Sequence, residues 1–447
     1  MARKTTRRHS QGETSRQAIL DATLRIAGQR GYVGTTLAQV TRASGLPASS
    51  VYWHFGNKDE LLADALDHGL AQWDGTVPPW GELDPERPRE DELFAQMAAI
   101  TRTLDEASGF WRMGLLIALE TGPQVGSGPR ERFVAARRRA LARVADWWQR
   151  SLAAERHAGV AGDADDGSTQ ADAARAQTLA LLTMVAMDGL FLTHQSDHDE
   201  DLGPLLRLAA VGLDAAARQL SEGLAPLRPT PAAPPMRRVV ADPDSSRSRF
   251  LEAAASVAAE SGYEGASISR ICERAGLPAS SLYWHFKDKD DLLAAVIEHS
   301  YQEWSLAQPG WLPPEPGTQW QDALRAHFAV SLGGLADRPL FLRMGHQLLL
   351  LQRENPPAAR ERFVAVRRQA RLVSREWYAD ALGVEADDGL PDGMSLLTMV
   401  LSDGLFFSNQ IDVPTWDVEV FAELVVTMLS TAAERPVAVR GQAAAPS

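Results

Sequence analysis

The sequence of 447 residues contains a single cysteine, Cys272, and no long uninterrupted apolar run. One cysteine excludes a disulfide framework within the chain. The longest apolar stretch, from Leu179 to Leu192, contains Asp188 and is too short to span a bilayer. No apolar segment typical of a secretory signal stands near the N-terminus. These absences predict a cytoplasmic protein with no membrane partner, and the length predicts two or more domains.

Net positive charge is also lacking, since the formal net charge is −13. The charge is unevenly distributed, however. Residues 1–58 hold nine basic and two acidic residues, whereas residues 237–289 hold eight basic and seven acidic residues. A basic end on an acidic body is typical of a sequence-selective DNA-binding protein, because long-range repulsion discourages non-specific coating of DNA.

The chain carries a long internal repeat. The segment Gly45-Leu-Pro-Ala-Ser-Ser-Val-Tyr-Trp-His-Phe55 returns at residues 276–286 with ten of eleven positions identical. Further matches at similar offsets join 58–62 to 289–293, 130–135 to 360–365, and 182–191 to 397–406. The small polar and aromatic residues are kept as well as the apolar pattern. The sequence therefore predicts two duplicated halves that each present the same kind of binding surface.

Apolar residues recur at three- and four-residue spacing between the breaks, and no strand pattern is apparent. We therefore expect an all-α fold with about nine or ten helices per half. A stretch rich in Pro and Ala separates the halves and predicts a semi-extended linker. The expected boundaries are 13–62 and 245–293 for the two small N-terminal domains, 63–223 and 294–435 for the two helical bodies, and 224–244 for the linker.

The repeated motif has the pattern of a helix-turn-helix. A helix over about 15–30 ends at Gly31, short helices follow over 36–43 and 47–54, and Gly45 allows the sharp turn between them. Thr36 and Gln39 have the spacing of a capping box. The second short helix begins with proline and small residues, which allow its N-terminus to enter a major groove.

These residues resemble the TetR family of bacterial transcription regulators. The family pattern, Gly-Tyr-x-x-Thr-Thr, a helix, and Gly-Leu-x-x-x-x-Val/Leu-Tyr-x-His-Phe-x-x-Lys-x-x-Leu-Leu, matches both halves over about 50 residues each. The resemblance implies two tandem units, each with an N-terminal helix-turn-helix three-helix domain and an α-helical ligand-binding and dimerisation domain. Typical members have one unit and pair. Two units in one chain therefore imply an intramolecular pseudo-dimer.

The resemblance also implies which residues bind DNA. Contacts in the groove are expected from the starts of the two reading helices and from a tryptophan in each, namely Ala48, Ser49, Ser50 and Trp53, with Ala279, Ser280, Ser281 and Trp284. Contacts to phosphates are expected from Thr36, Tyr52, His54 and Lys58, with Ser267, Tyr283, His285 and Lys289. Gln39 becomes Arg270 and Arg42 becomes Glu273 in the second copy. We therefore expect similar half-sites with different flanking contacts and stronger binding by the first head at low salt.

Candidates for the ligand-binding and pairing surfaces are less specific. Aromatic and charged residues that suit a pocket are Phe110, Trp111, Arg112 and Trp147, with Phe341, Arg343, His346 and Trp377. Ordinary core packing is an equally simple interpretation of these aromatics. The second pocket is expected to be the more polar, since His346-Gln347 replaces Leu115-Leu116. The repeated Asp-Gly-Leu-Phe segments resemble the family's dimerisation region, and this resemblance implies pairing roles for Asp188, Leu190 and Phe191 and for the matching Asp403, Leu405 and Phe406.

No set of residues predicts catalysis. His194, Asp197, His198 and Asp199 have loosely metal-like spacing, but a solvated acidic loop is the favoured interpretation, and neither a metal nor a cofactor is expected. Without a nucleophile and base pair, an enzyme is not expected.

The sequence thus predicts a ligand-responsive repressor whose partners are a double-stranded DNA operator and a small-molecule effector. Two alternatives stay open: further self-association that places four reading heads on DNA, and a helical co-regulator or scaffold whose heads bind protein. The effector, the operator bases and the sign of regulation do not follow from the sequence.

Overall fold

The computed structural model describes most of the chain. The described residues are 2–77, 80–84, 86–120, 122, 125–159, 166–198, 200–224, 245–306, 310–311, 317, 319–336, 340–353, 355–386, 388–411 and 417–434. Every regular element within these residues is a helix, as predicted. Residues 225–244 of the expected linker, and Asp199, lie outside the described residues.

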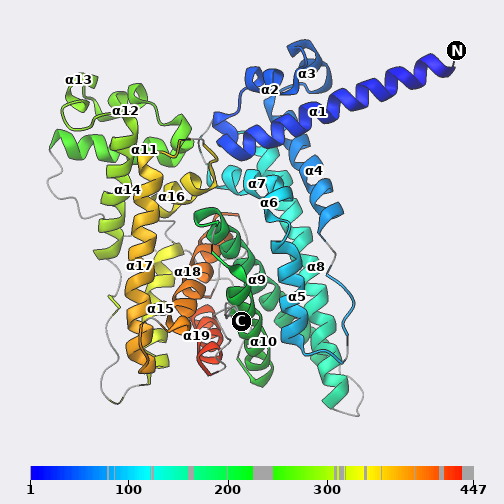
Figure 1. Cartoon of the computed structure of the whole chain (residues 1–447), viewed down its shortest axis with the longest axis vertical. Helices are drawn as coiled ribbons and strands as arrows, with labels where there is room; N and C mark the ends of the chain where they lie inside the picture. Colours follow the sequence, from blue (N-terminus) through cyan, green and yellow to red (C-terminus); the bar gives the residue numbers. More distant parts are fainter. Residues whose placement is uncertain are drawn as a thin grey trace, which may run out of the picture.

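Each half contributes a succession of helices (Figure 1). Those of the first half are α1 (Ala2–Gly34), α2 (Leu37–Ser44), α3 (Ala48–His54), α4 (Lys58–Thr76), α5 (Arg89–Thr101), α6 (Leu104–Ala107), α7 (Gly109–Leu119), α8 (Ser127–Gly159), α9 (Asp166–Ser196) and α10 (Leu202–Glu222). Those of the second half are α11 (Ser246–Gly265), α12 (Ile268–Ala275), α13 (Ala279–Leu282), α14 (Lys289–Leu306), α15 (Trp320–Ala336), α16 (Leu340–Leu350), α17 (Ala358–Leu382), α18 (Gly389–Gln410) and α19 (Val418–Glu434).

Local sequence explains the short helices at the top of each half. The Thr36 hydroxyl accepts a hydrogen bond from the Gln39 backbone N–H at 3.3 Å, and the Gln39 side chain accepts one from the Thr36 N–H at 2.8 Å. This confirms the capping box that starts α2. Gly45 then ends α2 in the left-handed region, at φ 69°, and Gly276 does the same after α12, at φ 62°. Other residues are strained there, so glycine defines both turns.

Several helix boundaries differ from the predictions. Helix α1 begins at Ala2, well before the predicted start near residue 15, and α2 spans Leu37–Ser44, one residue later than expected. The predicted break at Gly31 is confirmed, because Gly31, at φ 69° and ψ −172°, leaves the helical conformation and a further turn follows it to Gly34. Helix α3 begins one residue later than expected, since Pro47 is extended and acts as the N-cap. In the second half α13 is only four residues long, whereas α3 has seven. Helices α3 and α13, the second helices of the two helix-turn-helix motifs, thus differ in length although their sequences are nearly identical.

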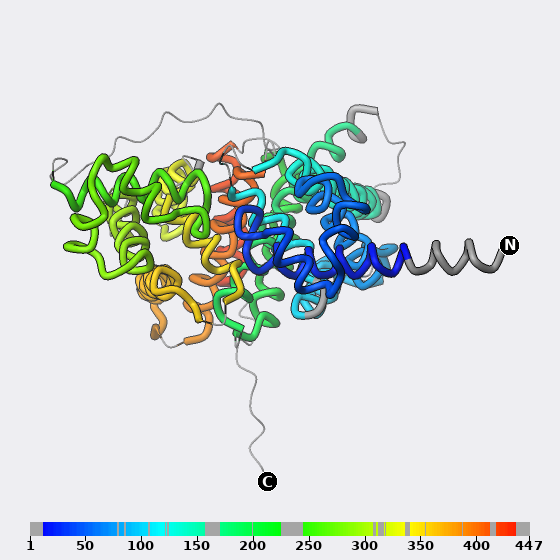
Figure 2. The backbone as a smooth tube through the Cα atoms, turned by 90° about the horizontal axis from the view of Figure 1, so that it is seen from above, coloured from blue at the N-terminus to red at the C-terminus, as the bar shows by residue number. Residues whose placement is uncertain are grey.

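The two halves pack on each other through helices α9, α10, α18 and α19 (Figures 1 and 2). The closest approach is between α9 and α18. A Cβ atom added to Gly189 would lie 1.9 Å from the Val400 carbonyl oxygen, and one added to Gly404 would lie 1.9 Å from the Val185 carbonyl oxygen. Glycine is therefore required at both points for the helix backbones to come this close.

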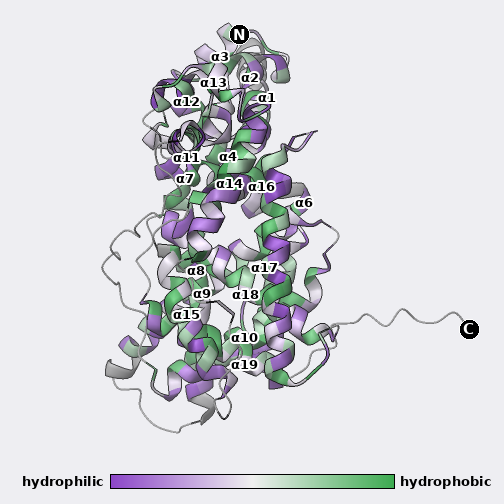
Figure 3. Cartoon of the chain, turned by 90° about the vertical axis from the view of Figure 1, so that its left-hand side faces the viewer, coloured by the Kyte–Doolittle hydropathy of each residue, from purple (hydrophilic) through white to green (hydrophobic). Residues whose placement is uncertain are grey.

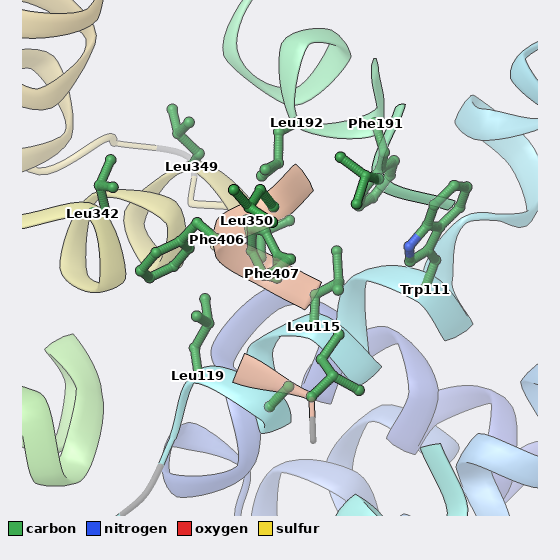
Figure 4. Packing of buried hydrophobic residues seen from close by; sticks show 14 of the residues in the cluster. Trp111, Leu115, Leu119, Phe191, Leu192, Leu342, Leu349, Leu350, Phe406 and Phe407 are labelled. Carbon is green, nitrogen blue, oxygen red and sulfur yellow. The ribbon is translucent and has the colours of Figure 1, made fainter. Parts of the chain in front are cut away.

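A single hydrophobic core runs across the contact between the halves. Buried Leu115 and Leu119 of α7 lie close to Phe406 and Phe407 of α18 (Figure 4), and helices α7, α9, α16 and α18 all contribute to the same cluster. The segment Gln170–Ser196 is long and apolar enough to cross a membrane by composition. Since 89% of its most apolar window is buried inside the protein, it is accounted for as a core helix of this bundle.

Candidate nucleic-acid interface

The pairs α2/α3 and α12/α13 lie at the same end of the molecule in both side views (Figures 1 and 3). Their aromatic residues are strongly exposed: Tyr52 by 60%, Trp53 by 77%, Tyr283 by 56% and Trp284 by 87%. Large exposed aromatics are unfavourable in water unless a partner covers them, so they mark a contact surface. Val51, which directly precedes Tyr52, is buried and anchors α3 to its domain.

The small residues expected in the groove are also accessible. Ala48, Ser49, Ala279 and Ser280 are exposed, as are Thr36, Ser267 and His285, whereas Ser50, Ser281 and His54 are half-buried. The ring of His54 packs edge-on against Trp53 with 4.6 Å between ring centroids. Nε2 of His285 instead lies 2.7 Å from the Ser246 hydroxyl. The two histidines therefore have different neighbours before any DNA is bound.

Lys58 and Lys289 do not extend freely into solvent as a simple phosphate clamp would. The Lys58 ammonium lies 4.3 Å from the centre of the Tyr32 ring, and the Lys289 ammonium lies 4.3 Å from that of Tyr263. Both lysines are half-buried, and burial lowers the pKa of each ammonium group. Each lysine therefore already stabilises the turn that follows the first helix of its domain, in addition to any role on DNA.

The two small domains touch directly through these turns. Helix α1 contacts α11, and a Cβ atom on Gly34 would lie 3.1 Å from Cγ of Glu264. Glu120, at the end of α7, reaches this junction and accepts a hydrogen bond from the Val33 N–H at 3.2 Å. Burial raises the pKa of Glu120 to about 8, although the N–H groups of Val33 and Tyr32 and the charge of Lys58 act in the opposite direction. A titratable carboxyl group therefore sits where the two heads meet the body.

The aspartates expected on the dimerisation surface face their own halves. Both Asp188 carboxylate oxygens accept hydrogen bonds from Arg137, at 2.7 and 2.6 Å, and Oδ1 also accepts one from Trp111 Nε1 at 2.9 Å. Phe191 stacks on the same Trp111 ring, with 4.9 Å between centroids. A buried carboxylate needs such partners to offset its desolvation, so Asp188 fixes the interior of the first half.

The second half repeats this arrangement with a different third partner. Asp403 binds Arg367 at 2.6 Å and His346 Nε2 at 2.9 Å. Burial alone would raise the pKa of Asp403, but the charges of Arg367 and His346 lower it to about 2. Burial lowers the pKa of His346, and the neighbouring Asp403 carboxylate acts in the opposite direction. Leu190, Leu405 and Phe406 are likewise buried.

The closest contact between the halves comes from Gly189 and Gly404, which the sequence interpretation did not single out. Both stand at the centre of the repeated Asp-Gly-Leu-Phe segments, and a glycine kept inside an apolar helix is the signal that indicates close helix packing. Arginines flank the contact. Arg130 donates to the Gln410 carbonyl at 2.6 Å, and Arg360 donates to the Gln195 carbonyl at 3.2 Å.

A cavity of about 310 Å³ lies within the first half. Its walls come from α4, α5, α7, α8 and α9 and from the segment between α4 and α5: Leu70, Trp73, Asp74, Val77, Trp80, Ile100, Phe110, Trp111, Phe133, Ala136, Arg137, Ala140, Arg143, Val144, Thr183, Met184 and Met187. Two of the predicted pocket residues, Phe110 and Trp111, are among them. The volume is at the lower end of the range for small-molecule sites, and the lining is mostly apolar and aromatic.

The other predicted pocket residues of the first half lie elsewhere. Arg112 does not line the cavity and instead donates to the Gln195 side chain of α9 at 2.7 Å. Trp147 is fully buried and packs edge-on against Trp80 and Trp148. It therefore supports the cavity wall without lining it.

The matching residues of the second half take part in packing. Phe341 lies between Tyr301 and Trp304, with centroids 5.6 and 5.0 Å away. Trp377 packs on Trp311 and Tyr378. Arg343 donates to the Ala259 carbonyl at 3.3 Å, and His346 is enclosed with Asp403. Phe341, His346 and Trp377 are therefore buried in packing contacts, whereas Arg343 is half-buried. A polar pocket formed by these residues stays a prediction.

Comparison with known proteins locates two matching domains. The family described as bacterial regulatory proteins, tetR family, matches residues 19–65 and again residues 250–296. The HTH-type transcriptional regulator AcrR of Shigella flexneri is 34% identical over 86 residues, which cover 19% of this chain and 35% of that protein. The regulator SrpR of Pseudomonas putida is 41% identical over 66 residues, covering 15% and 30%.

A third relative, the regulator LmrA of Bacillus subtilis, is 43% identical over 54 residues, covering 12% of this chain and 29% of that protein. The chain thus aligns with about a third of the length of each of these curated relatives. Each of these alignments covers between 54 and 86 residues of this chain.

Proposed function

The chain belongs to the TetR family of bacterial regulatory proteins, and from that premise we propose that it is a cytoplasmic transcriptional regulator that binds double-stranded DNA as a single-chain pseudo-dimer. Residues 13–62 and 245–293 are the two reading heads in this proposal, and 63–223 and 294–435 are the bodies that hold them. The operator is near-palindromic because the two reading segments differ at one position in eleven.

One observation carries this proposal. Two helix-turn-helix segments present exposed Tyr-Trp pairs at the same end of a molecule whose halves share one core. A two-fold operator places its half-sites about 34–36 Å apart, one DNA turn. Joining both heads in one chain makes their pairing independent of protein concentration.

The cavity of the first half supports control by a small molecule. It is lined by Trp73, Phe110 and Trp111, with Asp74 and Arg143 at its polar side. This chemistry suits an apolar, ring-bearing ligand with one polar group. In the proposal the protein is a repressor, and the ligand wedges α4 away from α7 and α8 and so moves the reading head that precedes α4.

Selection of bound sequences from a random duplex pool at near-physiological salt, followed by native mass measurement of the complex, tests the DNA proposal. We expect two inverted half-sites about one turn apart with one chain per duplex. The double variant Trp53→Ala/Trp284→Ala is the control and should enrich nothing. Two chains per duplex would replace the pseudo-dimer with a four-headed assembly, and no enrichment by the native chain would favour a protein-binding scaffold.

The effector proposal has a matched pair of variants. Ala140→Phe fills the cavity of the first half, and Ala370→Phe alters the corresponding position of the second. A ring-bearing compound that raises the melting temperature of the native chain should have no effect on Ala140→Phe and an unchanged effect on Ala370→Phe. If the compound raised the melting temperatures of both variants equally, the cavity of the first half would not be its binding site.

A further inference from the structure

Three side chains of the first half converge beside the contact between the halves. Asp105 belongs to α6, His194 to the last turn of α9, and His198 follows the end of that helix. One ligand atom from each lies within 4.8 Å of the other two. Oδ1 of Asp105 is 2.8 Å from Nε2 of His194, and the two imidazole rings lie 4.9 Å apart at 83°. Two nitrogen donors and one oxygen donor therefore share one small space.

We propose that Asp105, His194 and His198 form a binding site for a transition-metal dication of the zinc, cobalt or nickel type. Imidazole nitrogens with a carboxylate are the donors that these ions prefer, whereas magnesium and calcium take mostly oxygen ligands. Three protein ligands leave a coordination position for water or a further ligand.

The geometry allows the site to close around an ion. Donors at about 2.0–2.1 Å from a tetrahedral metal lie roughly 3.4 Å from one another, so the present spacing requires only small side-chain movements. The Asp105 side chain is 80% exposed and free to change rotamer, while that of His194 is 13% exposed and held by its surroundings. His194 therefore stays in place, and the Asp105 side chain moves to complete the coordination of the ion.

Charged groups also surround the site. The guanidinium groups of Arg112 and Arg360 lie near His198 and repel a dication, whereas the Asp105 carboxylate attracts it and offsets part of that repulsion.

The second half lacks this set of donors. At the positions that match His194 and Asp105, it has Asn409 and Ala336. One metal ion per chain is therefore expected. His194 directly precedes Gln195, whose carbonyl oxygen accepts the hydrogen bond from Arg360 of the second half. A bound ion thus fastens α6 to the end of α9 at the boundary between the halves.

The sequence favoured a solvated loop for this segment and could not bring in Asp105, which is 89 residues from His194. His194 and His198 alone have the spacing of two ligands on one helix face. Asp197, which the sequence placed with them, is not part of the cluster.

Zinc titration of the untagged full-length chain, stripped beforehand with a chelator, tests the proposal without DNA. We expect one Zn²⁺ per chain by native mass spectrometry and a visible absorption band of tetrahedral cobalt when Co²⁺ replaces zinc. His194→Asn, which installs the residue found in the second half, should lower the affinity roughly 100-fold or more, since loss of a direct ligand exceeds the 10–100-fold effect of an outer-shell change. Asp105→Ala, at an exposed position, should do the same with an unchanged circular dichroism spectrum.

His68→Asn is the matched control. His68 Nε2 lies 2.7 Å from Asp21 Oδ1, so this pair has the same chemistry as His194 and Asp105 but lies outside the three-donor cluster. Its zinc affinity should equal that of the native chain. Absence of stoichiometric binding, or an equal loss in the His68 and His194 variants, would overturn the metal site and leave the proposed DNA binding untouched.

Discussion

The two halves of this chain are duplicates in sequence pattern that differ in what their interiors enclose. In the first half Trp111 and Arg137 hold Asp188, and a cavity opens beside Trp111. In the second half His346 takes part in holding Asp403, and the aromatic rings pack on one another. The repeated helix-turn-helix segments differ least, since residues 45–55 and 276–286 are identical at ten of eleven positions. Among the described residues, the two halves therefore differ most in what surrounds the repeated aspartate.

The largest expected difference in stability comes from breaking the buried ion pairs of the two halves. Asp188→Asn and Asp403→Asn each leave a buried arginine without its charged partner, which costs about 3–5 kcal/mol of unfolding free energy. Denaturant unfolding of the two variants measures the loss. A much smaller loss for Asp403→Asn would mean that His346 and Arg367 rearrange, and that the second interior tolerates change better than the first.

The helix crossing tests whether the halves contribute symmetrically. Gly189→Ala and Gly404→Ala each place a methyl group 1.9 Å from a carbonyl oxygen of the opposite helix, so α9 and α18 must separate. We expect a loss of about 3 kcal/mol in each variant. Gly333→Ala is the control, because a Cβ atom there meets nothing within 4 Å, and it should stabilise α15 slightly. Unequal losses at the two crossing glycines would show an asymmetric contact.

The carboxyl group of Glu120 should make the stability of the protein depend on pH through the first half alone, because Leu351 occupies the matching position of the second half. Its folded-state pKa of about 8 lies above the usual value of 4.5, so the folded protein holds a proton that the unfolded chain loses. Stability should therefore fall as pH rises from about 4.5 to 8, by up to about 1.4 kcal/mol per pH unit, and then level off.

Glu120→Gln should remove that part of the pH dependence and raise stability above pH 8. Unfolding measured at several pH values in both proteins provides the check. An unchanged slope in the variant would assign the pH dependence to other groups.

The smallest expected difference concerns the reading heads. Trp53→Ala and Trp284→Ala should each weaken operator binding by about 1–2 kcal/mol, roughly tenfold, because each removes one exposed aromatic contact. Binding measured by fluorescence anisotropy at two salt concentrations separates the heads. The loss should be larger for Trp53, which lies on the longer reading helix, and reversal of that order would indicate that α13 extends on DNA.

Sequence patterns predicted the all-α fold, the duplication and the turns at Gly45 and Gly276, because these depend on spacing and on local backbone preferences. They also selected residues that the structure places on one exposed surface, such as Trp53 and Trp284. Their contacts with DNA remain predictions. The pocket residues were less well chosen: Phe110 and Trp111 line the cavity, but Trp147 lies behind its wall. The spacing of apolar residues indicates which face of a helix is buried. It does not indicate whether an aromatic side chain on that face lines a cavity or packs against a neighbouring side chain.

The sequence by itself determined the local features of this protein: the turns at glycine, which motif is repeated, and which charges change between the copies. Only the tertiary structure decided which distant groups meet. Glu120 reaches the turn of α1, Asp188 binds Arg137 and Trp111, and Asp105 joins His194 across 89 residues. The physical reason is that burial and pairing depend on distances between helices, and many helix arrangements are compatible with one pattern of apolar residues.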